Sequence, residues 1–172
     1  NVHETVRDMR HDSIDTIVAE AIPQNSFAEQ WDAEKLKASS RATLGLDIPA
    51  EDWVAEDGIA EEEIMERLQG LSDSYMAEKG TRFGPEIMRM AEKSLLLQVL
   101  DQQWKEHLLQ LEQLRQGINL RAYAQKDPLN EYKREAFIMF EAMLTTMRQT
   151  VTMALSHVEL REPGEELASP KA

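Results

Sequence analysis

The sequence contains no cysteine among its 172 residues, and only 6% of its residues are aromatic. Without cysteine there is no disulfide framework and no cysteine-based zinc site. No apolar run approaches the roughly 18–20 residues that a membrane-spanning helix needs. We also expect no signal segment, since no charged-then-apolar stretch opens the chain.

Recognisable catalytic motifs are also missing. The sequence has no GxxxxGK[ST], GxGxxG, HExxH or GxSxG pattern. Its four histidines, His3, His11, His107 and His157, lack the spacing of metal ligands. His107 lies beside Glu106, but adjacent residues on a helix point in different directions, so we interpret His107 as structural or solvated. We therefore predict no catalytic residues, no metal site and no cofactor in this chain.

Charge is unevenly distributed along the chain. The formal net charge of -13 argues against non-specific binding of nucleic acid, which needs an excess of Lys and Arg. Residues 47–66 contain nine acids and no base, but they lack the DxDxDG loop of an EF-hand, so we interpret them as a solvated acidic face. Residues 115–134 contain five bases and two acids, a local net charge of +3.

The composition and the periodicity predict an all-α fold. Leucines and nine methionines supply most of the apolar volume, which suits helices. Ser26 and Glu29 form a capping-box pattern, which predicts a helix that begins at Ser26 and stops at Gly45. The predicted helices cover residues 4–22, 26–44, a short segment within 46–58, and 61–79, where Gly80 is the stop signal. Residues 162–172 contain Pro163, Gly164 and Pro170 and resemble a linker.

A long antiparallel helical hairpin is the strongest prediction, over residues 84–161. Apolar residues step by three or four on both sides of residues 121–128, so each set shares one helix face and the two faces can bury each other. Asp127 and Pro128 are typical of a helix start. Helices of this size would be roughly 50 Å long. The predicted hairpin core contains Leu100, Trp104, Leu108, Leu111, Ile118, Phe140, Met147 and Val151.

The turn of this hairpin combines an aromatic ring, cations and an amide. We name it the fingertip, and it comprises Arg121, Ala122, Tyr123, Gln125 and Lys126. Two interpretations of Tyr123 remain open from the residues alone. The ring either folds back onto the hairpin, or it contacts a partner, since tyrosine is amphipathic and stiff.

Three segments resemble SecA, the family of ATP-driven motors of bacterial protein export. They are residues 100–108 (LDQQWKEHL), 114–128 (LRQGINLRAYAQKDP) and 131–137 (EYKREAF). Residues 22–26, 31–32 and 49–53 resemble the helical wing that precedes this region. The resemblance covers nearly the whole chain. It implies the end of a long scaffold helix over 1–20, a helical wing domain over 21–83, the scaffold's two-helix finger over 84–161 and a linker over 162–172.

The resemblance also implies partners and a location. In SecA, separate motor domains bind ATP and Mg and hydrolyse the nucleotide, while the finger reaches into the mouth of the SecY channel. The fingertip touches the moving polypeptide, and Tyr123 matches the tip tyrosine. The finger borders the signal-peptide groove and packs on the motor domains. Ala122 occupies a position at which some members have glycine. The family acts in the bacterial cytoplasm and at the cytoplasmic face of the inner membrane, as a peripheral protein.

The resemblance implies a non-catalytic piece of a larger translocation motor. In agreement with an excised piece, this chain begins at Asn1 in the middle of a helical pattern. The alternative is a stand-alone helical scaffold that binds a partner helix through its exposed stripe residues. An upstream GxxxxGK[ST] loop in the parent reading frame would distinguish the two.

Overall fold

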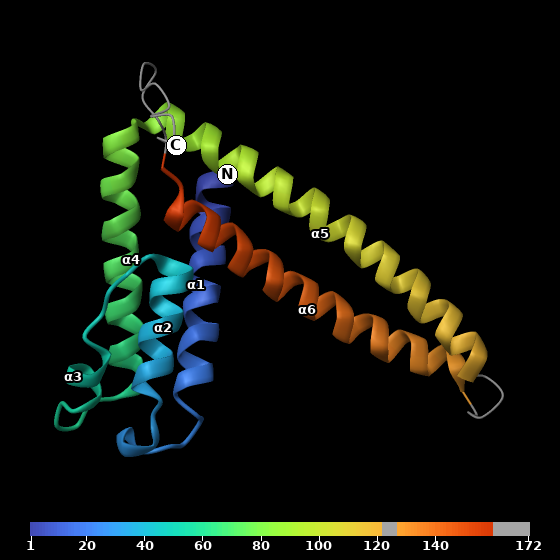
Figure 1. Cartoon of the computed structure of the whole chain (residues 1–172), viewed down its shortest axis with the longest axis horizontal. Helices are drawn as coiled ribbons and strands as arrows, with labels where there is room; N and C mark the ends of the chain where they lie inside the picture. The colour runs from blue at the N-terminus through green and yellow to red at the C-terminus, as the bar shows by residue number, and fades with distance from the viewer. Residues whose placement is uncertain (122–126, 160–172) are drawn as a thin grey trace, which may run out of the picture.

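A computed structural model describes residues 1–121 and 127–159 of the chain. Within these residues it contains six α-helices, one short 3-10 helix and no strand, so the all-α prediction is confirmed. Figure 1 shows two parts: helices α1, α2 and α4 lie side by side with the short α3 next to them, and α5 and α6 extend away from them together. We call the first part the bundle (α1–α4) and the second the hairpin (α5 and α6).

Helix α1 (Val2–Ala21) matches the predicted first helix. The Asn1 side chain caps its N-terminus by accepting a hydrogen bond from the His3 backbone N–H. The helix ends before Pro23, because a residue that precedes proline is disfavoured in the α conformation. Its buried residues Ile14, Ile17 and Val18 face the rest of the bundle.

The predicted start of the second helix is wrong. Residues Ala28–Gln30 form a 3-10 helix, and helix α2 runs over Ala33–Leu44. Its cap is Asp32, whose carboxylate accepts from the Lys35 N–H at 3.0 Å. The Ser26 hydroxyl is occupied elsewhere, since it donates to the Pro23 carbonyl and accepts from the Trp31 indole N–H. The predicted stop at Gly45 is confirmed by its left-handed φ of 66°.

Helix α3 (Ala50–Val54) is the short helix expected within residues 46–58. Helix α4 (Glu61–Phe83) continues through Gly80, where the sequence predicted its end. Glycine only weakens a helix interior, and the true stop is Gly84, whose φ of 90° is a conformation that other residues rarely adopt.

Helices α5 (Pro85–Arg121) and α6 (Pro128–His157) form the hairpin. The Asp127 side chain accepts from the Asn130 N–H at 3.2 Å and Pro128 is the first helical residue, so the predicted opening of α6 is confirmed. With 37 residues, α5 is about 55 Å long. The two helices run together from the bundle to an end remote from it (Figure 1).

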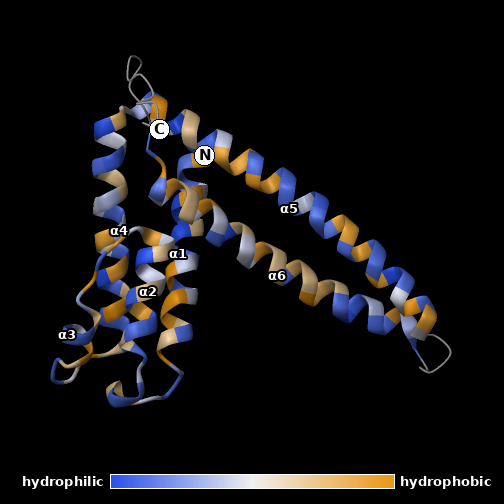
Figure 2. Ribbon diagram, in the orientation of Figure 1, coloured by the Kyte–Doolittle hydropathy of each residue, from blue (hydrophilic) through white to orange (hydrophobic). Residues whose placement is uncertain are grey.

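The described residues form two buried apolar clusters, of which one joins the bundle to the hairpin. The larger lies inside the bundle and includes residues of α1, α2 and α4 together with Ile48, Ala50 and Ile59. The smaller joins Val6 of α1, Met88 of α5, and Val151 and Leu155 of α6, so it lies where the hairpin meets the bundle. Along α5, hydrophobic and hydrophilic segments alternate for the whole length of the helix (Figure 2). The helix therefore has no single apolar face, and its contacts with other helices determine which face is buried.

Candidate functional site

The C-terminal end of α6 is held by a buried lysine. Lys79 of α4 is only 1% exposed. Its Nζ donates to the carbonyls of Ser156 at 2.7 Å and Leu155 at 3.3 Å. The Tyr75 hydroxyl donates to the same Ser156 carbonyl at 3.0 Å. The last carbonyls of a helix lack partners within the helix and form its negative end, so a cation there both pairs them and favours the dipole.

The position of Lys79 has an electrostatic cost. Burial lowers the pKa of Lys79 from its ordinary value of 10.5, and Glu159 opposes this shift only in part. The Lys79 ammonium also lies 5.3 Å from the centre of the Tyr75 ring, within the range of a cation–π contact. The carbonyls of α6 and this ring replace the water that the ammonium loses.

Helix α2 meets the same end of α6. His157 Nε2 lies 2.8 Å from the Ala42 carbonyl, the geometry of a hydrogen bond that the imidazole N–H donates. A side chain at Gly45 would come within 3.5 Å of the Ser156 carbonyl, so the ends of α2 and α6 are in close contact. We name the group of Tyr75, Lys79 and His157 the latch. It fixes α6 to two bundle helices at once.

A second polar cluster ties α1 to α4. Arg10 donates to the Asp73 carboxylate at 2.6 Å, and His11 Nε2 lies 2.8 Å from the same oxygen. Burial favours the neutral acid, but the hydrogen bonds from His11 and Arg10 outweigh it, so the pKa of Asp73 is lowered from 3.8. The folded state therefore prefers the carboxylate.

This lowered pKa makes a pH-dependent prediction for Asp73→Asn. The carboxylate contributes stability above its unfolded pKa of 3.8, and this contribution is lost as the pH falls through the lower folded pKa. At neutral pH we expect a loss of about 1 kcal/mol in the free energy of unfolding, because Asp73 is partly exposed and solvent screens the pair. Urea denaturation of the variant and the native chain at pH 7 and pH 3 measures the difference in the free energy of unfolding at each pH. A difference between variant and native chain that is as large at pH 3 as at pH 7 would contradict the assignment.

Over residues 100–108, the hairpin buries a different face of α5 from the one predicted. Leu100, Trp104 and Leu108 were expected in its core, yet they are 41%, 45% and 51% exposed. In this stretch the buried position is His107, whereas further along the helix Leu114 and the predicted core residue Ile118 are buried as expected. One residue corresponds to about 100° around a helix, so the face that contains His107 is well separated from the one that contains Leu108. Of the remaining predicted core residues, Met147 and Val151 are buried, and Leu111 and Phe140 are half-buried.

His107 is a structural residue, in agreement with the interpretation from sequence. It is 4% exposed, and its ring centre lies 5.7 Å from those of both Trp104 and Phe140. Its Nδ1 is buried and has no hydrogen-bond partner within the described part of the chain. The imidazole therefore serves as an aromatic link between the two helices.

Comparison with known proteins identifies the family. The profile of the SecA Wing and Scaffold domain matches residues 1–159. The chain belongs to this SecA family. The resemblance found in the sequence is thereby confirmed.

Several named SecA proteins are similar over almost the whole chain. Protein translocase subunit SecA of Afipia carboxidovorans is 50% identical over 170 residues, which are 99% of this chain and 18% of that protein. The SecA of Rhodopseudomonas palustris strain BisB18 is 52% identical over 165 residues, or 96% of this chain and 17% of the relative. The SecA of Bradyrhizobium diazoefficiens is 48% identical over 166 residues, or 96% and 18%. The chain thus spans less than a fifth of the length of these relatives.

The fingertip lies outside the described residues. Ala122, Tyr123, Gln125 and Lys126 fall in the segment 122–126, and of Arg121 only the backbone, at the end of α5, is described. In the described helices of this SecA domain, Arg121 and Asp127 end the two arms of the hairpin remote from the bundle (Figure 1).

Metal-ligand clusters and membrane-spanning helices are both absent from the described residues of this SecA domain. Among residues 1–121 and 127–159, no three His, Asp or Glu side chains gather in a way that could hold a metal ion. No helix in the same residues combines the length and the hydropathy needed to cross a membrane.

The latch was missed from the sequence, although a signal for it exists. Lys79 continues the buried stripe of α4 at helical spacing, after Ile64, Leu68 and Ser72. A lysine at such a position is usually expected to reach solvent. Only the arrival of the α6 C-terminus, from a segment far along the chain, shows why a cation is buried there.

Proposed function

We propose that this chain is the non-catalytic arm of a SecA protein translocase, which carries movement of the motor domains to the polypeptide in transit. The observation that supports it is a hairpin about 55 Å long whose root is fixed to the bundle by the latch and by the apolar cluster around Val151. A long, firmly rooted hairpin can transmit a displacement at its root to its remote end.

In this proposal the fingertip contacts the translocating polypeptide at the mouth of the SecY channel. The finger borders the signal-peptide groove, and ATP and Mg are bound by motor domains outside this chain. The parent works in the bacterial cytoplasm and at the inner membrane, as a peripheral protein. Membership of the SecA family and the names of the relatives, which are translocase subunits, support this assignment.

The test uses full-length SecA with a photo-reactive cysteine derivative in place of Tyr123. A preprotein stalled during export should cross-link to this position, because the fingertip is the end of the arm. The matched control is the same substitution at Lys133, an exposed residue of α6, which should cross-link far less. Equal cross-linking at both positions would argue against a specific contact.

A companion measurement separates contact from packing. Tyr123→Ala in full-length SecA should reduce translocation by about tenfold or more while it changes the free energy of unfolding by less than about 0.5 kcal/mol, the size expected of a substitution that removes no packing. If the variant lost several kcal/mol of stability and kept its translocation rate per folded molecule, Tyr123 would be a packing residue.

A second candidate function rests on the exposed face of α5. Leu97, Leu100, Trp104 and Leu108 lie at helical spacing and are 41–54% exposed. A stripe of this kind suits the apolar face of a partner helix. Replacing Trp104 and Leu108 with glutamine should then abolish partner binding and leave the hairpin folded.

A further inference from the structure

A cavity lies at the root of the hairpin, apart from the fingertip and the latch. It has a volume of about 380 Å³ and is bounded by α1, α4 and the first turns of α5, with Leu155 of α6 at one wall. Pockets for small molecules have volumes of about 300–1,000 Å³. Its apolar walls include Val6, Met76 and Met88. These flexible and branched side chains suit a short hydrocarbon chain.

Both acids that line the cavity already have partners. Asp73 accepts from Arg10 at 2.6 Å and is 2.8 Å from His11. Glu92 is only 2% exposed, and both of its carboxylate oxygens lie near His3 Nδ1, at 3.0 and 3.1 Å. These carboxylates are therefore not free to bind a cation.

The arginines that line the cavity are less fully paired. Within the described residues, Arg89 has no ion pair, and Arg7 has only an exposed contact with Asp8 at 3.4 Å. The Nε of Arg10 is buried without a hydrogen-bond partner in the same part of the chain. The cavity is thus lined by three arginines and two acids that already have partners, although the overall net charge of the chain is -13.

We propose that this cavity binds a small amphipathic anion, a free carboxylate on a short hydrocarbon chain. Arg89 and Arg7 would hold the carboxylate, since guanidinium groups form strong charge-assisted hydrogen bonds with it. The hydrocarbon chain would lie against Met76 and Met88. The ligand would contact α1, α4 and α5 together, at the joint between hairpin and bundle.

The experiment is a titration of the whole 172-residue chain with octanoate, followed by NMR of the backbone amides. Saturable binding is expected, with the largest shifts at residues that line the cavity. Octylammonium tests the charge and acetate tests the hydrocarbon chain, and each should bind at least about tenfold more weakly. No saturation by about 10 mM octanoate, or equal binding of octylammonium, would overturn the proposal.

Two variants locate the site. Arg89→Gln should weaken octanoate binding about tenfold, the value of one charge-assisted hydrogen bond. Lys93→Gln, one turn further along α5 and outside the cavity wall, should leave it unchanged. Gly80→Leu should abolish binding by filling the cavity, since a Cβ at Gly80 meets only Met88, at 3.8 Å. Undiminished binding by Arg89→Gln would contradict the proposal even if Gly80→Leu did not fold.

Discussion

Lys79→Ala is expected to lower the free energy of unfolding by about 3 kcal/mol. The variant loses the buried aliphatic stem, at about 0.8 kcal/mol for each buried CH₂. It also leaves the Leu155 carbonyl of α6 without its buried donor, which costs roughly 1–3 kcal/mol. The loss is partly offset, because the variant no longer has to bury a charged ammonium group. Urea denaturation measures the change, with Lys93→Ala, an exposed lysine of α5, as the matched control.

A second pair of variants isolates the hydrogen bonds of the latch. Lys79→Met keeps most of the stem and should cost only about 1–2 kcal/mol. Tyr75→Phe removes the other donor to the Ser156 carbonyl and should cost about 1 kcal/mol. Because Lys79 and Tyr75 share that acceptor, the double variant should lose about 1 kcal/mol more than the sum. Strict additivity would show that the two donors act independently.

Val151→Asp is expected to destabilise the chain by at least about 4 kcal/mol. Val151 is fully buried between α1, α5 and α6, and an unpaired charge in such a place is strongly unfavourable. Val151→Ala should cost roughly 2 kcal/mol, because it only opens a small cavity. Met153→Asp, on the same helix but 42% exposed, is the matched control and should have little effect. A loss at Met153 equal to that at Val151 would mean that α6 packs through another face.

Local signals predicted the existence and the direction of the hairpin correctly. Asp127 and Pro128 supply a cap and a preset φ, and both act within a single turn of helix. Gly45 predicted its helix end for the same local reason. Ser26 failed as a cap because a nearby indole and a carbonyl compete for its hydroxyl.

The buried face of α5 up to His107 could not be predicted from its sequence, although Ile118 beyond it was predicted correctly. Helix α5 carries apolar residues on more than one side, and the stripe from Leu97 to Leu108 is more hydrophobic than the face that contains Glu92 and His107. The periodicity of apolar residues therefore predicted that the more hydrophobic stripe, from Leu97 to Leu108, is the buried one. The contact with α6 and α1 selected the other face, where Glu92 has a histidine partner and His107 lies between aromatic rings.

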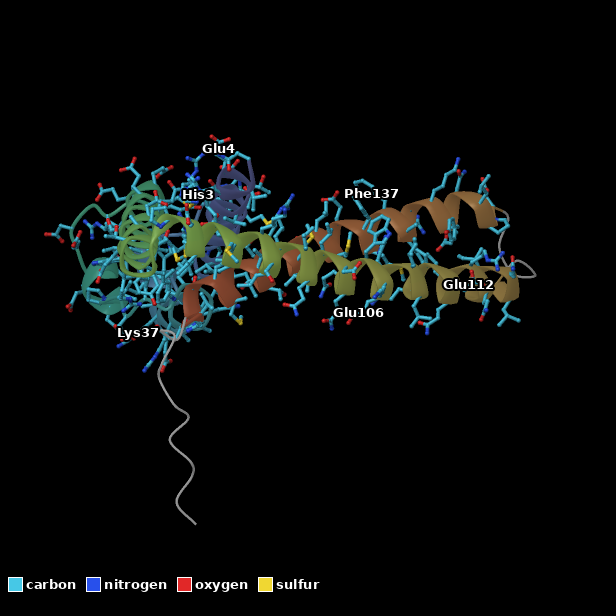
Figure 3. The ribbon with its side chains drawn as sticks, turned by 90° about the horizontal axis from the view of Figure 1, so that it is seen from above. His3, Glu4, Lys37, Glu106, Glu112 and Phe137 are labelled. Carbon is cyan, nitrogen blue, oxygen red and sulfur yellow. The ribbon has the colours of Figure 1, made fainter. Side chains whose placement is uncertain are left out.

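Figure 3 shows the two exposed sides of the distal hairpin through labelled side chains. Phe137 of α6, which is 65% exposed, points to one flat side of the hairpin, and Glu106 of α5 to the other. Neither side is covered by the bundle over this distal part. The arm is therefore rooted at one end only, and its stiffness depends on the latch and on the contact between its two helices.

We expect the root of the hairpin to be rigid, and the distance between two spin labels measures this rigidity. Because the chain has no cysteine, labels at Lys37→Cys on α2 and Lys133→Cys on distal α6 are unambiguous, and both positions are exposed. Double electron–electron resonance should give a single narrow distance distribution, which broadens in Lys79→Met. A broad or two-component distribution in the chain with an intact latch would show that the hairpin pivots freely on the bundle and that the latch does not fix it.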